Sequence, residues 1–177
     1  MKKVLLLYWS ATGNTKACAD SIAEGFREAG CAVDLLKTDE AAEVNFFDYD
    51  LIAMGSPSYN WHVPLPVDKF LKGKFQEYKA QGRVLPGAPK IGKDAVLFCT
   101  YSGPHTGIRE AVPTVKYIEQ FFEHFGFTVQ DEWYILSKFV GSEENSTLGR
   151  MGDIRDLPTD GDLQRLKSAA VNLIRRL

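Results

Sequence analysis

Hydrophobic positions along the chain form two alternating patterns, short continuous runs and stripes at helical spacing. The continuous runs predict strands covered on both faces at Val4–Tyr8, Ala32–Leu36, Leu51–Met54, Ala95–Tyr101 and Thr128–Ser137. The stripes predict helices over Asn14–Ala29, over Pro64–Leu71, from Pro113 to a stop at Gly126, and from a cap at Thr159 or Asp160 toward the C-terminus. Strands that alternate with helices imply right-handed crossovers and a parallel sheet. The pattern therefore predicts an α/β fold, a doubly wound five-stranded parallel sheet with helices on both faces.

Two stretches lack either pattern, and we expect loops there: Gly73–Lys93 and Lys138–Leu157. Loops of this length in a compact protein are often functional, so the second is a candidate lid or assembly contact. The chain has 177 residues, 45% of them hydrophobic, which is enough to bury both faces of one sheet. We expect a single domain over residues 1–177.

Charge and cysteine content narrow the classes of partner. The formal net charge is -2 and the isoelectric point is about 5.9, so nothing favours binding to nucleic acid or an anionic membrane. The three cysteines show no paired spacing, which is typical of a reducing compartment. No apolar run is long enough to span a bilayer. We therefore expect a cytoplasmic protein with a small-molecule or protein partner, whose oligomeric state the sequence leaves open.

The first predicted strand is followed by a candidate phosphate site. The residues Ser10, Ala11, Thr12, Gly13, Asn14 and Thr15 lead directly into the first predicted helix. Hydroxyl donors, a glycine turn and the free N–H groups of a helix start would converge there, and the helix dipole favours an anion. The P-loop and dinucleotide fingerprints are both absent.

The loops after the third and fourth predicted strands should flank this site, because parallel sheets bind ligands outside the carboxyl ends of their strands. Glycine, proline, hydroxyl and aromatic residues are concentrated in both loops. The first loop, residues 56–64, contains Ser56, Pro57, Ser58, Tyr59, Asn60 and Trp61, and the second, residues 100–107, contains Thr100, Tyr101, Ser102 and Gly103. Tyr59, Trp61 and Tyr101 are candidates to stack on a flat heteroaromatic ring. We call these the first and second ring loops.

Other functions that use an α/β sheet fit the sequence less well. A response-regulator receiver needs an aspartate at the end of the third strand, where Met54 and Gly55 stand. A serine hydrolase needs a GxSxG elbow, which Ser10 lacks. Three histidines and three cysteines lie scattered, without the short spacing of metal ligands. No catalytic or metal-binding residue is predicted.

The SxTGNT, GSPSYN and TYSG segments resemble those of flavodoxin and the flavodoxin-like FMN proteins, over about Val4 to Leu136. The resemblance implies that FMN is the cofactor. It also implies that Ser10 and Thr12 to Thr15 hold the FMN phosphate, and that Ser56 to Trp61 with Thr100 to Gly103 hold the ribityl chain and the ring. The two ring loops contain no Asp or Glu, unlike those of acidic electron carriers, so we expect a less negative hydroquinone potential.

Two function classes follow from the resemblance. One is electron transfer without catalysis, as a carrier between redox partner proteins such as a reductase and an acceptor. The other is an FMN-dependent NAD(P)H oxidoreductase that acts on a quinone, a flavin or a similar acceptor. The sequence shows no nicotinamide site and favours the carrier modestly, so whether the protein is an enzyme stays open.

Overall fold

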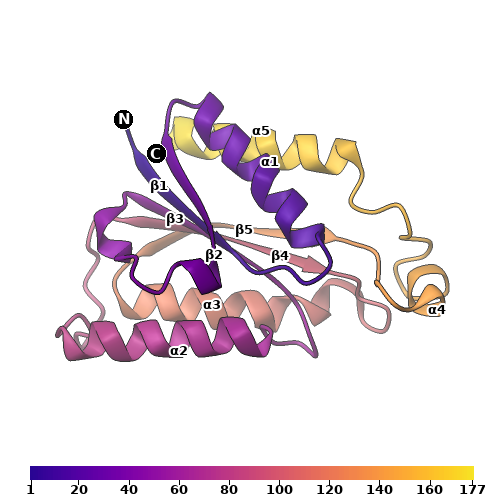
Figure 1. Ribbon diagram of the computed structural model, residues 1–177, viewed down its shortest axis with the longest axis horizontal. Helices are drawn as coiled ribbons and strands as arrows, with labels where there is room; N and C mark the ends of the chain where they lie inside the picture. Colours follow the sequence, from indigo (N-terminus) through magenta and orange to yellow (C-terminus); the bar gives the residue numbers. More distant parts are fainter.

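The computed structural model describes all residues, 1–177, and contains the predicted five-stranded parallel sheet (Figure 1). The strands are β1 (Lys3–Tyr8), β2 (Ala32–Lys37), β3 (Leu51–Pro57), β4 (Asp94–Tyr101) and β5 (Thr128–Leu136). They lie in the order β2-β1-β3-β4-β5, and every neighbouring pair is parallel. The chain runs from β1 to β2 on one side and then passes back to β3 on the other side of β1. The carboxyl ends of β1 and β3 therefore meet where the strand order reverses.

Helices cover both faces of the sheet (Figure 1). One face carries α1 (Asn14–Glu28) and α5 (Asp160–Arg176), and the other carries α2 (Leu65–Ala80) and α3 (Val112–His124). A short helix, α4 (Glu143–Thr147), lies beyond the edge of the sheet. The predicted doubly wound α/β architecture is confirmed. No α-helix combines the length and the apolar content that crossing a bilayer would need.

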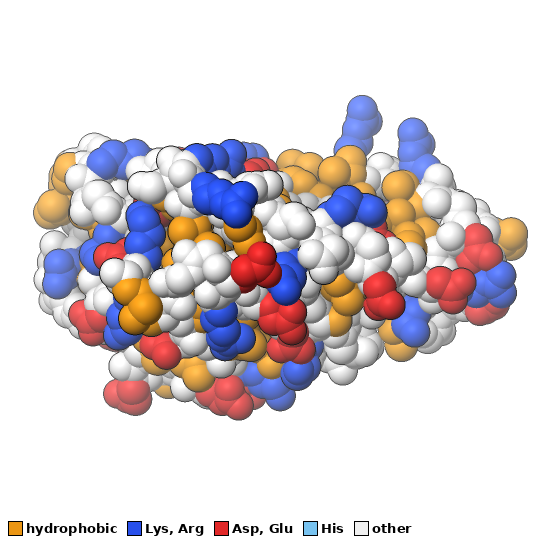
Figure 2. Space-filling model, turned by 90° about the horizontal axis from the view of Figure 1, so that it is seen from above, with side chains coloured by type: hydrophobic (Ala, Val, Ile, Leu, Met, Phe, Trp, Pro, Cys, Tyr) orange, Lys and Arg blue, Asp and Glu red, His pale blue; other side chains and the backbone are white.

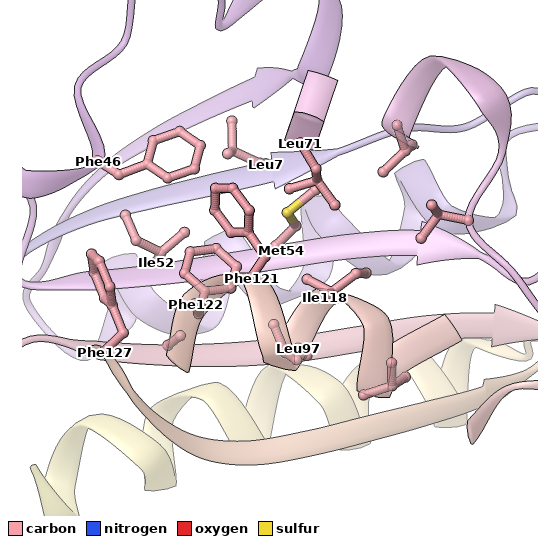
Figure 3. Packing of buried hydrophobic residues seen from close by; sticks show 14 of the residues in the cluster. Leu7, Phe46, Ile52, Met54, Leu71, Leu97, Ile118, Phe121, Phe122 and Phe127 are labelled. Atoms are coloured by element: carbon pink, nitrogen blue, oxygen red, sulfur yellow. The ribbon is translucent and has the colours of Figure 1, made fainter. Parts of the chain in front are cut away.

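Each face of the sheet buries its own hydrophobic cluster. On the α2 and α3 face, aliphatic strand residues such as Ile52 and Leu97 pack against helix aromatics such as Phe122 (Figure 3). On the α1 and α5 face, Leu6 and Phe98 pack against Ile22 and Ala170. Burial on both faces explains why the central strands are continuous apolar runs. These two clusters hold the strand ends at fixed positions.

The second helix is longer than predicted. It continues past Leu71 to Ala80, so the loop expected from Gly73 onward was wrong for its first eight residues. The misleading residue is Lys74, which occupies a core-facing position between Leu71 and Tyr78 with a side chain only 3% exposed. Its ammonium group bonds to Glu77 at 2.8 Å and lies 5.6 Å from the Tyr78 ring centroid. The Lys74 side chain therefore continues the buried face of α2, although a lysine interrupts the pattern of apolar residues in the sequence.

The segment Lys138–Leu157 is a compact loop rather than an extended one. Lys138 N–H donates to the Leu157 carbonyl and closes its neck, while the buried Ser146 hydroxyl bonds to the backbone of Phe139. The start of α4 is capped by the Ser142 side chain. The loop therefore has its own small interior, which gives it a defined shape against the sheet edge.

Candidate functional site

The predicted phosphate nest lies between the end of β1 and the start of α1. Gly13 takes a positive φ of 98° and donates its N–H to the Ser10 hydroxyl at 3.1 Å. No side chain caps α1, and its first turn contains no acidic residue. The N–H groups at the start of α1 therefore remain available to an anion. Lys16 is paired with Asp20 at 2.7 Å, so the nest relies on neutral donors.

The first ring loop contains a tight turn. Tyr59 and His62 exchange both backbone hydrogen bonds, at 2.8 and 3.0 Å, around Asn60 and Trp61. Both central residues have positive φ, 50° and 63°, as in a type I′ turn, although neither is glycine. Tyr59 and Trp61 are 44% and 62% exposed. The turn thus holds a strained backbone and presents two aromatic side chains to solvent.

Two hydrogen bonds link the three loops. The Thr15 and Thr100 hydroxyls, both buried, lie 2.8 Å apart and link the nest to β4. Ser58 N–H donates to the Thr100 carbonyl at 2.9 Å and links the two ring loops. The three segments that the sequence predicted to converge therefore do converge at one edge of the sheet.

A cavity of about 510 Å³ opens between these loops. Every predicted binding residue lines it except Gly13 and Ser56. Gly13 shapes the turn before α1, and Ser56 is fully buried with its hydroxyl bonded to the Pro57 carbonyl at 2.9 Å. Ser56 therefore lies behind the lining of the cavity, whereas Gly13 is exposed and lies beside it. The size of the cavity is that of a cofactor site.

The sequence prediction missed a third wall. The cavity is also lined by Ala11, Pro104, His105, Glu110, Ser137, Lys138, Phe139, Val140 and Asn145. Ser137 N–H donates to the Tyr101 carbonyl at 2.8 Å, which continues the sheet past β5. The Asn14 side chain donates to the Lys138 carbonyl at 3.4 Å across the mouth of the nest. The signal was available, because the carboxyl end of β5 lies at the same sheet edge.

Charged side chains are few around the cavity. Lys138 and Glu110 line it, together with His105, whereas His62 packs against Tyr117 with ring centroids 4.4 Å apart and ring planes tilted by 46°. The face over α1 and α5 shows basic and acidic side chains interspersed, with hydrophobic ones gathered toward the end that holds α4 (Figure 2). The absence of carboxylates within the ring loops holds, but Glu110 places one carboxylate beside them.

The three cysteines take no part in the site. Cys18, Cys31 and Cys99 are free and buried. Burial raises the pKa of the Cys18 thiol to about 12, and it also raises the pKa of Cys99. Thiols held protonated in this way are poor nucleophiles and poor metal ligands. Their role is to fill the core.

The donor set of the cavity fits a flavin nucleotide. Neutral hydroxyls and helix N–H groups suit a phosphate, while Tyr59, Trp61 and Tyr101 supply flat apolar surface for a ring. Gly13 has open space around its missing side chain, with no atom within 4 Å, so the turn before α1 is not blocked by neighbouring atoms. The residues present therefore agree with such a group.

Comparison with known proteins identifies the family. The model of the family described as flavodoxin domain matches residues 5–85. The NAD(P)H dehydrogenase (quinone) of Bradyrhizobium sp. (strain ORS 278) is 43% identical over 149 residues, covering 73% of this chain and 70% of that protein. The chain belongs to the flavodoxin-like family. It is thus a redox protein of a family that uses a flavin.

A second relative and a solved structure agree with the assignment of this chain to the flavodoxin-like family. The NAD(P)H dehydrogenase (quinone) of Afipia carboxidovorans is 30% identical over 188 residues, covering 95% of this chain and 88% of that protein. Flavodoxin 1 from Bacillus cereus has a TM-score of 0.69 at 16% identity, with 99% of both chains covered. At this identity the similarity to the Bacillus cereus protein concerns the fold alone, and it extends over nearly the whole of this chain.

Proposed function

We propose that the protein binds one FMN in the cavity at the carboxyl ends of β1, β3 and β4 and transfers electrons through it between redox partner proteins. The observation that supports this most is the convergence of a neutral phosphate nest with two aromatic ring loops around one cavity. The sequence contains one predicted phosphate nest and no dinucleotide fingerprint, which favours a mononucleotide over FAD.

In this proposal different residues bind the phosphate and the ring of FMN. Ser10 and Thr12 to Thr15 bind the phosphate through hydroxyl and backbone N–H groups. Tyr59, Trp61 and Tyr101 pack against the ring and exclude water from it. Bound FMN would supply both one-electron and two-electron redox chemistry. The protein positions the group and sets its potential through the charges of Glu110 and Lys138.

A second candidate function is an FMN-dependent oxidoreductase that takes electrons from NAD(P)H and reduces a quinone or similar acceptor. Two relatives that share 43% and 30% identity with this chain carry the name NAD(P)H dehydrogenase (quinone). The rim also offers exposed apolar surface for a hydrophobic acceptor, at Trp61, Phe139 and Val140. Both functions require the same flavin site.

One experiment tests the site and separates the two functions. The purified protein is reconstituted with FMN, and its visible spectrum is recorded without oxygen before and after one equivalent of NADH or NADPH. Flavin bands that persist with pyridine nucleotide but decrease in two steps with dithionite support the carrier. Prompt bleaching by NAD(P)H, followed by recovery with a quinone, supports the oxidoreductase. Failure to hold FMN overturns both.

A matched pair of variants tests the phosphate nest. Thr12→Ala removes a hydroxyl that lines the cavity, and Thr147→Ala removes one in α4 that does not line it. Hydrogen bonds to a charged group contribute about 1.5–3 kcal/mol, so Thr12→Ala should weaken FMN binding about tenfold or more. Riboflavin, which lacks the phosphate, should bind both variants like the wild type. Equal loss for FMN and riboflavin would contradict the assignment of the nest.

A further inference from the structure

Glu110 is the carboxylate that lines the cavity, and it lies outside every segment that the sequence singled out. It ends the short 3₁₀ turn Gly107–Glu110, which follows the second ring loop. Glu110 is partly buried, and no lysine or arginine forms an ion pair with its carboxylate within 4 Å. A carboxylate in such a place would bind a cation or hold backbone donors, and its contacts show the second.

The carboxylate of Glu110 binds the backbone of the second ring loop. One oxygen accepts hydrogen bonds from the N–H groups of His105, at 2.8 Å, and Thr106, at 2.6 Å. Hydrogen bonds to an ionised acceptor are among the stronger ones in proteins. The side chain therefore fixes the turn that follows Gly103 and Pro104, two residues that line the cavity.

The peptide carbonyl of the same residue binds the first ring loop. It accepts a hydrogen bond from the Ser58 hydroxyl, and Ser58 in turn accepts one from the Thr114 hydroxyl at 2.8 Å. Glu110 thus contacts one ring loop through its side chain and the other through its backbone. Glu110 therefore adds to the link that the Ser58–Thr100 hydrogen bond already makes between the two loops.

The second ring loop needs such a clamp because its backbone is crowded. Gly103 and Gly107 both have positive φ, 55° and 69°. An added Cβ at Gly103 would lie 2.7 Å from the Gly107 carbonyl oxygen, so the two ends of the turn nearly touch. Chains with this much glycine have many alternative conformations, and a fixed acceptor selects one of them.

The two hydrogen bonds to the Glu110 carboxylate are exposed, so their effect on loop position can differ from their effect on the stability of the fold. The two N–H groups that Glu110 accepts lie in exposed residues, so water can replace the carboxylate if it is removed. Loss of the side chain should therefore cost the folded protein little free energy. It should still release the loop, because water imposes no particular conformation on the two donors.

We propose that Glu110 is a positioning residue that holds the two ring loops in the spacing that receives a flavin ring. The inference rests on the proposed function of the cavity. It predicts that binding of the ring portion of the ligand depends on Glu110, whereas binding of the phosphate at the nest does not. If the free loop adopts the competent shape one time in ten, the dissociation constant rises about tenfold.

Three variants of the full-length protein test this. Glu110→Ala removes the acceptor, Glu110→Gln keeps an acceptor oxygen without the charge, and Glu43→Ala removes an exposed carboxylate that does not line the cavity. Dissociation constants for FMN and riboflavin are measured by quenching of flavin fluorescence. Competition by inorganic phosphate reports on the nest. Backbone amide exchange at residues 105 and 106 is followed by NMR on the flavin-free protein.

The expected result is a selective loss in one variant. Glu110→Ala should bind FMN and riboflavin about tenfold more weakly, with unchanged phosphate competition, a melting temperature close to that of the wild type and faster exchange at both amides. Glu110→Gln should stay within about threefold of the wild type, and Glu43→Ala should match it.

Two other results would overturn the inference. Wild-type affinity for both flavins in Glu110→Ala, or equal losses for phosphate and riboflavin, would show that Glu110 does not position the ring loops. Failure of the wild-type protein itself to bind any flavin would refute the proposed function, and with it the purpose assigned to Glu110. The wild-type titration distinguishes these cases.

Discussion

Gly55 lies on β3 directly opposite Phe98 on β4, one residue before the first ring loop begins. An added Cβ at this position would lie 2.0 Å from two atoms of the Phe98 ring. Phe98 is fully buried in the cluster beneath α1 and α5, so its ring cannot move without displacing its neighbours. The substitution Gly55→Ala therefore forces an overlap inside a closely packed layer.

The magnitude of this effect follows from the geometry. Overpacking of a buried layer typically costs about 1–3 kcal/mol, and we take about 2 kcal/mol for one methyl group against a ring. In a chain of this length each kcal/mol lowers the melting temperature by about 2–4 °C, so Gly55→Ala should lose about 4–8 °C. Because β3 leads into Ser56 and Pro57, the variant should also bind FMN more weakly.

Urea denaturation followed by circular dichroism measures the loss, and a second substitution tests its cause. Phe98→Leu removes the ring, so the double variant should be more stable than the sum of the single effects predicts, by about 1 kcal/mol or more. Gly73→Ala is the matched control, since that glycine lies in α2 with no atom within 4 Å of an added Cβ. It should stabilise the protein by about 0.5–1 kcal/mol. A Gly55→Ala change below about 0.5 kcal/mol, or strict additivity in the double variant, would refute the reasoning.

Three further predictions concern stability around the site and at the helices. Thr15→Val leaves the buried Thr100 hydroxyl without its partner and should cost about 1–3 kcal/mol in a denaturant titration, and adding Thr100→Val should recover part of that loss; a neutral single variant would contradict this. The hydrogen bond from Lys72 lowers the pKa of Asp68 below its usual value, so Asp68 stabilises the fold above about pH 4 and this contribution disappears as pH falls through the folded-state pKa. Asp68→Asn should therefore be less stable than the wild type at pH 7, with a difference that narrows below about pH 4, and parallel pH profiles would exclude this role. Thr159→Ala removes the hydroxyl that caps α5 and should lower stability by about 1 kcal/mol by thermal unfolding, whereas an unchanged melting temperature would mean that the cap contributes nothing.

Most of the sheet could be predicted from the sequence because its central strands are buried on both faces. Continuous apolar runs such as Leu51–Met54 have no other simple explanation in a chain that also contains amphipathic helices. The same logic located the nest and the two ring loops, since the carboxyl ends of parallel strands meet at one edge. The residue types and the rule that parallel strands end at one edge were sufficient to predict the sheet, the nest and the two ring loops.

Other features contradict the usual preference of the residue types that form them. The length of α2 was underestimated because Lys74 occupies a core position, and only its pairing with Glu77 near Tyr78 makes that burial acceptable. The positive φ of Asn60 and Trp61 was equally hidden, since neither residue is the glycine that usually indicates such a turn. In each case the residue type alone predicts a different conformation or a different exposure from the one observed.

The sequence by itself determined the architecture, the sheet edge that bears the cavity and the chemical character of most of its lining, because burial and hydroxyl-rich turns leave a local pattern. Only the tertiary structure decided that Lys138 and its neighbours close the third side and that Glu110 binds both ring loops. The physical reason is that a hydrogen bond between residues 52 or 124 positions apart has no periodic signature in the chain. It exists only once packing has brought its two ends together.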